Sequence, residues 1–131
     1  MQRDVPVAVL WLRVARADLD IATEPDVTDP FALGLRCYHA QQAAEKALKA
    51  VLVHHDAEVP RTHILADLLA LLHDVETVPP NVEASRQLTV YATSTRYPDE
   101  LIEATPKDQN DAADLASAVI EWAAGIVESV E

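Results

Sequence analysis

The feature that most constrains how this chain can fold is a stripe of small apolar residues at helical spacing. At about 100° per residue, one side of a helix carries a set of aliphatic side chains, namely Ala40, Ala44, Ala47, Leu48 and Val51. The opposite side carries a polar column, namely Tyr38, Gln42, Glu45 and Lys49. The small residues predict close packing against another helix. The polar column predicts a surface that presents chemistry.

The composition around this stripe is typical of an all-α protein. Ala, Leu and Val recur at intervals of three and four residues, the 131 residues include only 2 Gly, and no run alternates with the period of two that a strand needs. A chain of this length fits one domain. We therefore expect residues 1–131 to form a single helical domain with one core.

Prolines and capping residues divide the chain into five expected helices. Asp29 before Pro30 suits an N-cap followed by proline at the first helical position, and Thr62 is placed to cap the third helix. The expected helices cover residues 5–22, 30–55, 62–75, 81–93 and 106–130, the last starting at Pro106 or Asp108. Long helices joined by short loops pack most simply as antiparallel neighbours. The predicted fold is an antiparallel up-and-down four-helix bundle with an additional short helix.

The charge and the cysteine content restrict the partners and the compartment. With 22 acidic and 10 basic side chains the net charge is −12, which disfavours binding to RNA because phosphates repel an acidic surface. Cys37 is the only cysteine, and the N-terminus lacks the long apolar core of a secretion signal, so a reducing cytoplasm is expected. No apolar run is long enough to cross a bilayer, so no membrane association is predicted.

Three blocks of the sequence together resemble the HEPN domain (higher eukaryotes and prokaryotes nucleotide-binding). They are the segment 38–50, the block Thr62-His63-Ile64-Leu65, and the block Thr95-Arg96-Tyr97-Pro98-Asp99. The resemblance implies a small all-α, nucleotide-associated protein that forms a homodimer. It also implies a gene beside that of a minimal nucleotidyltransferase, in a toxin–antitoxin-like pair.

Some members of this family are metal-independent ribonucleases that use an Arg followed four to six residues later by a His. This chain departs from that spacing, because Arg36 precedes His39 with two residues between them and Arg61 precedes His63 with one. Such a reaction needs a proton-transfer group and a cation near the phosphorane. His39 and Arg36 are the candidates, since residues three apart lie on neighbouring parts of a helix surface.

The remaining candidate residues are predicted to contact a ligand or a protein partner. Lys46 and Lys49 suit a phosphate or an acidic partner, although Glu45 and Lys49 also have the spacing of an exposed helical ion pair. The full set is Gln42, Glu45, Lys46, Lys49, His63, Arg96 and Tyr97. The chain has neither a Gly-rich phosphate loop nor paired Glu-x-x-His motifs. We therefore predict neither a cofactor nor a metal.

Three functions remain open at this point. The first is a dimeric binding module that associates with a nucleotidyltransferase, and the missing Arg-to-His spacing and the acidity favour it. The second is a ribonuclease with a non-standard site, built from His39 with Arg36 or His63 with Arg96. The third is a substrate of the partner transferase, in which Tyr97 or Tyr38 receives a nucleotide.

Overall fold

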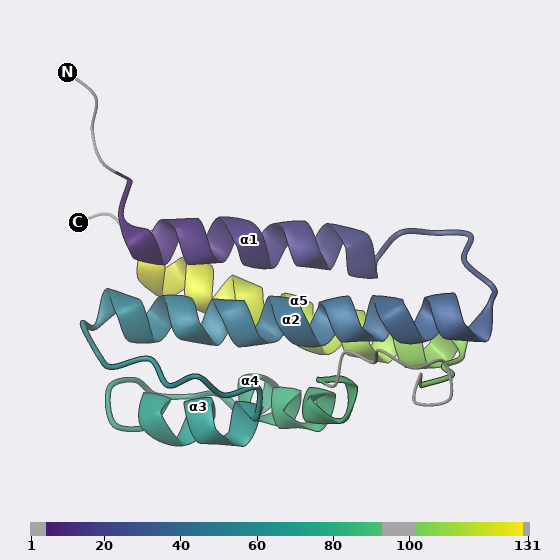
Figure 1. Cartoon of the computed structure of the whole chain (residues 1–131). Coiled ribbons are helices and arrows are strands. Elements are labelled where there is room, and N and C mark those ends of the chain that lie inside the picture. The colour runs from purple at the N-terminus through teal and green to yellow at the C-terminus, as the bar shows by residue number, and fades with distance from the viewer. Residues whose placement is uncertain (1–4, 93–101, 130–131) are drawn as a thin grey trace.

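The computed structural model describes residues 5–92 and 102–129, and every regular element in this part of the chain is helical (Figure 1). The elements are α1 (Val7–Ala22), α2 (Pro30–His54), α3 (Leu65–Leu72), α4 (Pro80–Glu83), the 3₁₀ helix η1 (Ala84–Tyr91) and α5 (Pro106–Val127). The predicted all-α fold is confirmed. No helix in the described ranges is both long and apolar enough to span a membrane.

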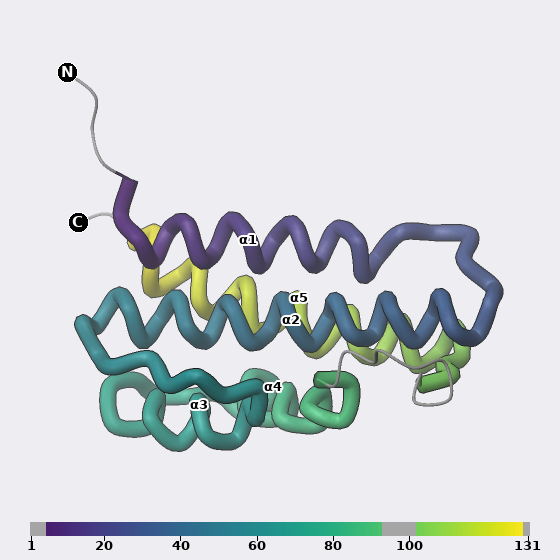
Figure 2. The backbone as a smooth tube through the Cα atoms, in the orientation of Figure 1, coloured from purple at the N-terminus to yellow at the C-terminus, as the bar shows by residue number. Residues whose placement is uncertain are grey.

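The chain runs up and down between three long helices and one interrupted arm. α1 is antiparallel to α5, because Gln109 near the start of α5 donates to the Ala22 carbonyl at the end of α1, at 2.8 Å. α2 returns antiparallel to α1 and parallel to α5 (Figure 2). The arm between α2 and α5 contains α3, α4 and η1. It covers the side of α2 that is opposite to α1 (Figure 1).

α2 is the central helix of the bundle and is enclosed by α1, α3, η1 and α5. Its small residues are buried on more than the one predicted stripe, since Ala43 and Ala50 are as inaccessible as Ala44 and Ala47. Alanines have little side chain to hold helix axes apart, so neighbours can approach α2 closely. Facing alanines on α5 continue this packing, namely Ala112, Ala116 and Ala123.

Two of the long helices begin with the caps that their sequences encode. The Asp29 carboxylate accepts from the backbone N–H groups of Phe31 and Ala32, at 3.1 and 3.0 Å, which confirms the predicted N-cap of α2. At the start of α5, Thr105 and Asp108 exchange side-chain and backbone hydrogen bonds as a capping box. Both helices also carry proline at their first position.

The interrupted arm differs from the two helices predicted there. The Thr62 hydroxyl accepts from the Ile64 N–H, but α3 starts only at Leu65 and ends at Leu72 instead of near Val75. The expected helix over 81–93 is one α-helical turn followed by η1. Buried residues along this segment recur every third position, namely Val82, Ser85 and Leu88. A helix with three residues per turn keeps all of them on one side, facing the bundle.

Gly34 is the position where the backbone of another segment comes closest to α2. A Cβ atom at Gly34 would lie 1.8 Å from the Ile102 carbonyl oxygen. The neighbouring backbone bond from the Ala104 N–H to the Pro30 carbonyl, at 3.0 Å, fixes the same segment against the start of α2. Only a residue without a side chain allows this approach.

Replacing Gly34 by Ala should lower the free energy of unfolding by about 1–3 kcal/mol, because the added methyl group forces α2 and Ile102 apart. Gly125→Ala is the matched control, since nothing lies within 4 Å of a Cβ there. It should raise the stability by up to about 1 kcal/mol through helix propensity. Urea unfolding followed by circular dichroism measures both. A Gly34→Ala protein as stable as the wild type would contradict the close approach.

Candidate functional site

The first candidate site is a cluster around the Glu45 carboxylate of α2. Lys49 Nζ lies 2.8 Å from Glu45 Oε2, one helical turn further on. His63 Nδ1 lies 3.0 Å from Oε1, and Gln41 Nε2 donates to the same oxygen at 3.1 Å. Gln41 also donates to the His63 carbonyl at 3.2 Å, so α2 and the segment before α3 are joined twice. We call these four residues the Glu45 cluster.

The predicted exposure of this polar column is wrong for Glu45 and Lys49. Glu45 is 3% exposed and Lys49 is 8% exposed, because α1 and the segment before α3 cover this side of α2. Lys49 Nζ lies 5.8 Å from the Trp11 ring centroid, which adds a cation–π contact from α1. Gln42 is half-buried and donates to the Gln41 side chain at 2.7 Å. The column is an internal polar network instead of a solvated helix face.

The second cluster surrounds Asp18, which lies on α1. Lys46 Nζ lies 2.7 Å from Asp18 Oδ2, and His39 Nδ1 lies 3.1 Å from Oδ1. Asp18 is 8% exposed, and it was not among the predicted site residues. The available signal was its spacing, three residues after Ala15 and four before Ala22 on the inward side of α1. A carboxylate on that side has to meet a cation. We call these three residues the Asp18 cluster.

The structure does not bring Arg36 and His39 to a common target. Arg36 Nη2 pairs with Glu24 Oε2 at 2.8 Å, whereas His39 bonds to Asp18. Residues three apart are neighbours on a helix surface, but these two side chains are drawn to carboxylates of different segments, Glu24 after α1 and Asp18 within α1. Arg96 and Tyr97, predicted to join this site, lie outside the described residues.

The basic side chains of the segment 36–50 are all matched by carboxylates. A side-chain nitrogen of each of Arg36, Lys46 and Lys49 lies within 2.8 Å of a carboxylate oxygen. Burial acts to raise the pKa of Glu45, but hydrogen bonds from Lys49, His63 and Gln41 outweigh it, so the pKa of Glu45 is lowered. A phosphate approaching these cations would have to compete with ionised carboxylates already in place. The geometry therefore suits a fixed polar network more than a phosphate site.

His63 is the member of the Glu45 cluster that reaches solvent. Its side chain is 68% exposed, while its carboxylate partner is buried. An ionised carboxylate only accepts, so Nδ1 carries the hydrogen of this bond and Nε2 of the neutral ring is left as an acceptor. A histidine oriented in this way could move a proton at Nε2.

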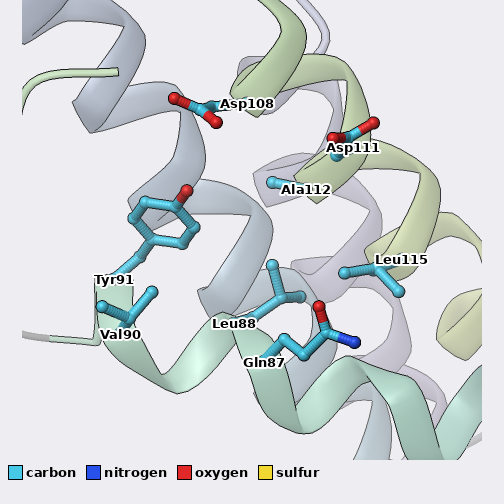
Figure 3. A pocket seen from close by; sticks show the side chains of 8 residues that line it. All are labelled: Gln87, Leu88, Val90, Tyr91, Asp108, Asp111, Ala112 and Leu115. Carbon is cyan, nitrogen blue, oxygen red and sulfur yellow. The ribbon is translucent and has the colours of Figure 1, made fainter. Parts of the chain in front are cut away.

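A separate pocket of about 250 Å³ lies between η1 and α5 (Figure 3). Its polar lining comes from Gln87, Tyr91, Asp108 and Asp111. Burial and the nearby Cys37, Asp108 and Asp111 raise the pKa of Tyr91 to about 12, so its hydroxyl stays protonated. Asp108 is also the capping residue of α5. The carboxylates make this pocket unsuited to phosphate.

Metal ligation finds no support in the described part of the chain. Over residues 5–92 and 102–129, no group of three or more His, Cys, Asp or Glu side chains is placed to hold a metal ion. Two further histidines pair singly with carboxylates: His55 with Glu76 at 2.7 Å and His73 with Glu83 at 2.6 Å.

The chain is similar to known all-α proteins in both sequence and fold. The HEPN domain model matches residues 8–127, and the chain belongs to the HEPN domain family. The crystal structure of TT1696 from Thermus thermophilus is similar at a TM-score of 0.73 and 30% identity, over 91% of this chain and 97% of that one. ST0689, an archaeal HEPN homologue, is similar at a TM-score of 0.67 and 25% identity, over 97% and 99%. A comparison with curated proteins found no match.

Glu45→Gln should lower the free energy of unfolding by about 3–5 kcal/mol at neutral pH, because it leaves Lys49 buried without a counter-charge. Glu128→Gln is the matched control, since it breaks the exposed pair with Arg16 and should cost about 1 kcal/mol or less. Urea unfolding at pH 7 compares them. Equal losses in the two variants would contradict a buried Glu45 cluster.

The same carboxylate should make stability depend on pH in the acid range. The pKa of Glu45 in the folded chain lies below its ordinary value of 4.5, so its contribution is complete above pH 4.5 and is lost as the pH falls through the lower folded value. Thermal unfolding between pH 7 and pH 2 should therefore show a shallower acid decline in Glu45→Gln than in the wild type. Parallel curves would contradict the lowered pKa.

Proposed function

We propose that this chain is a non-catalytic, dimeric HEPN module that binds a minimal nucleotidyltransferase in a toxin–antitoxin-like pair. The observation that carries the proposal is the pairing of Arg36, Lys46 and Lys49 with Glu24, Asp18 and Glu45 at 2.7–2.8 Å. A ribonuclease needs a cation available to the phosphorane. Here the candidate cations already neutralise carboxylates of their own chain, which supports binding over cleavage.

The net charge of −12 supports a protein partner over a nucleic acid. An acidic surface attracts a basic protein surface and repels a polyanion. The transferase would therefore present a basic face to this module. The cytoplasm is the proposed compartment, which is consistent with the reduced state expected of the buried Cys37.

One observation favours a second candidate function, a ribonuclease with a non-standard site. His63 is 68% exposed and is held through Nδ1 by the buried Glu45, which is how a general base is commonly oriented. The cation for this reaction would have to be Arg96, whose position the structure does not describe. The described residues therefore supply the general base of this candidate site, His63, but not its cation.

Purified protein should leave a mixed RNA pool intact in the presence of a metal chelator, with no difference between the wild type and His63→Ala. Gel electrophoresis of end-labelled RNA measures this. Cleavage that is lost in both His39→Ala and Arg36→Ala, or in both His63→Ala and Arg96→Ala, would overturn the proposal. His54→Ala is the control, because His54 has no carboxylate partner among the described residues.

Co-expressed with a minimal nucleotidyltransferase from the same genome, the protein should elute with it as one complex in size-exclusion chromatography. Separate elution at micromolar concentrations would contradict the proposed pairing. Mass spectrometry after addition of ATP distinguishes a bound partner from a modified substrate. A nucleotide attached to Tyr38 or Tyr97 would instead identify the chain as a substrate of the transferase.

A further inference from the structure

α1 carries a second apolar stripe that faces away from the bundle. Its larger members are Val7, Leu10, Val14 and Ile21, which are 58%, 44%, 47% and 40% exposed, and exposed Ala17 continues the spacing. The inward stripe of the same helix is buried, namely Ala8, Leu12, Ala15 and Ala22. At 100° per residue the two stripes lie roughly 140° apart around α1. α1 is thus apolar on two nearly opposite sides.

The outward stripe has the form of a helix-docking surface. Its first half surrounds a shallow hollow of about 260 Å³ that is lined only by apolar side chains, those of Val7, Leu10, Trp11 and Val14. Residues at 7, 10, 14, 17 and 21 follow the alternating three- and four-residue spacing of a coiled-coil seam. α1 packs against α2 and α5 and lies at the outside of the bundle (Figure 1), so this seam is accessible to another molecule.

We propose that the occupant of this seam is α1 of a second copy of the chain, lying antiparallel. This inference deepens the proposed function, since it rests on the dimer named there and assigns its surface. In the central register Val14 faces Ala17 of the partner subunit, and Leu10 faces Ile21 of the partner subunit. A large residue then lies opposite a small one at the middle, and aliphatic residues meet at both ends.

The charges beside the seam select this register. On one flank of the stripe, Arg13 and Asp20 have no ion-pair partner among the described residues. In the proposed register Arg13 faces Asp20 of the partner subunit, and the two-fold symmetry repeats the pair. A shift by one heptad would instead place Arg13 against Arg13 of the partner subunit, which is repulsive. Charge thus favours the central register over the register shifted by one heptad.

The other flank connects the proposed dimer to the polar clusters. Trp11 and Asp18 both lie on that flank, so the register places Trp11 opposite Asp18 of the partner subunit. In its own chain Trp11 already contacts Lys49 of the Glu45 cluster. Dimerisation would therefore cover the edge of the Asp18 cluster in each copy.

Light scattering coupled to size exclusion, at several micromolar concentrations, tests the seam. The wild type should be a dimer, and Leu10→Lys or Arg13→Glu should weaken it about tenfold or more. Combining Arg13→Glu with Asp20→Arg should restore the dimer. The two positions are seven residues apart, about 10.5 Å along one helix, so this rescue requires contact between copies. Val90→Lys, at a 63% exposed position on η1, is the matched control and should leave the dimer intact.

The outcomes separate this inference from the proposed function. If the wild type is a dimer that Leu10→Lys and Arg13→Glu leave unchanged, the seam is wrong while the dimeric module stands. If the wild type is a monomer at these concentrations, the chain does not form the proposed dimer. Both the α1 seam and the dimeric state in the proposed function are then wrong. A third outcome is that Leu10→Lys dissociates the dimer while the double variant Arg13→Glu with Asp20→Arg stays monomeric. The stripe is then the interface, but the antiparallel register is wrong. Circular dichroism of each variant verifies that the exposed substitutions leave the helices folded.

Discussion

The structure depends on one constraint, the enclosure of α2 by the rest of the chain. Because α1, α3, η1 and α5 all contact it, almost no side of α2 is left for solvent. Alanine makes this enclosure feasible, since it lets several helices approach one axis closely. Every polar side chain on α2 must then find a partner inside the protein, or its burial would cost more than the packing gains. The polar clusters follow from this requirement.

The two clusters show how the requirement is met. Glu45 is surrounded by Lys49, His63 and Gln41, and Asp18 is shared by Lys46 and His39. Each carboxylate joins α2 to another segment. Glu45 of α2 bonds to His63 before α3, and Asp18 of α1 bonds to Lys46 and His39 of α2. The polar residues of these two clusters thus serve first to fix the relative positions of helices. Cations engaged in this way offer little to a phosphate.

α1 has apolar residues on two sides, and one of these sides is exposed. One side holds the bundle together, and the Asp18 carboxylate lies at the edge of that buried side. The other side exposes a seam that the bundle does not use. Trp11 lies between the two, with Lys49 near its ring. An assembly through the outward seam would therefore act directly on the helix that supports the polar clusters.

By itself the sequence determined the three long helices and the family, because helical spacing and caps such as Asp29 are properties of neighbouring residues. It also determined the absence of the ribonuclease spacing after Arg36 and Arg61. It could not place Glu45 and Lys49 in the interior, or pair Lys46 with Asp18, since periodicity shows which residues share a side but not what covers it. Contacts between residues 18 to 28 positions apart exist only once the helices pack. Tertiary structure therefore decided that an expected surface is an internal network.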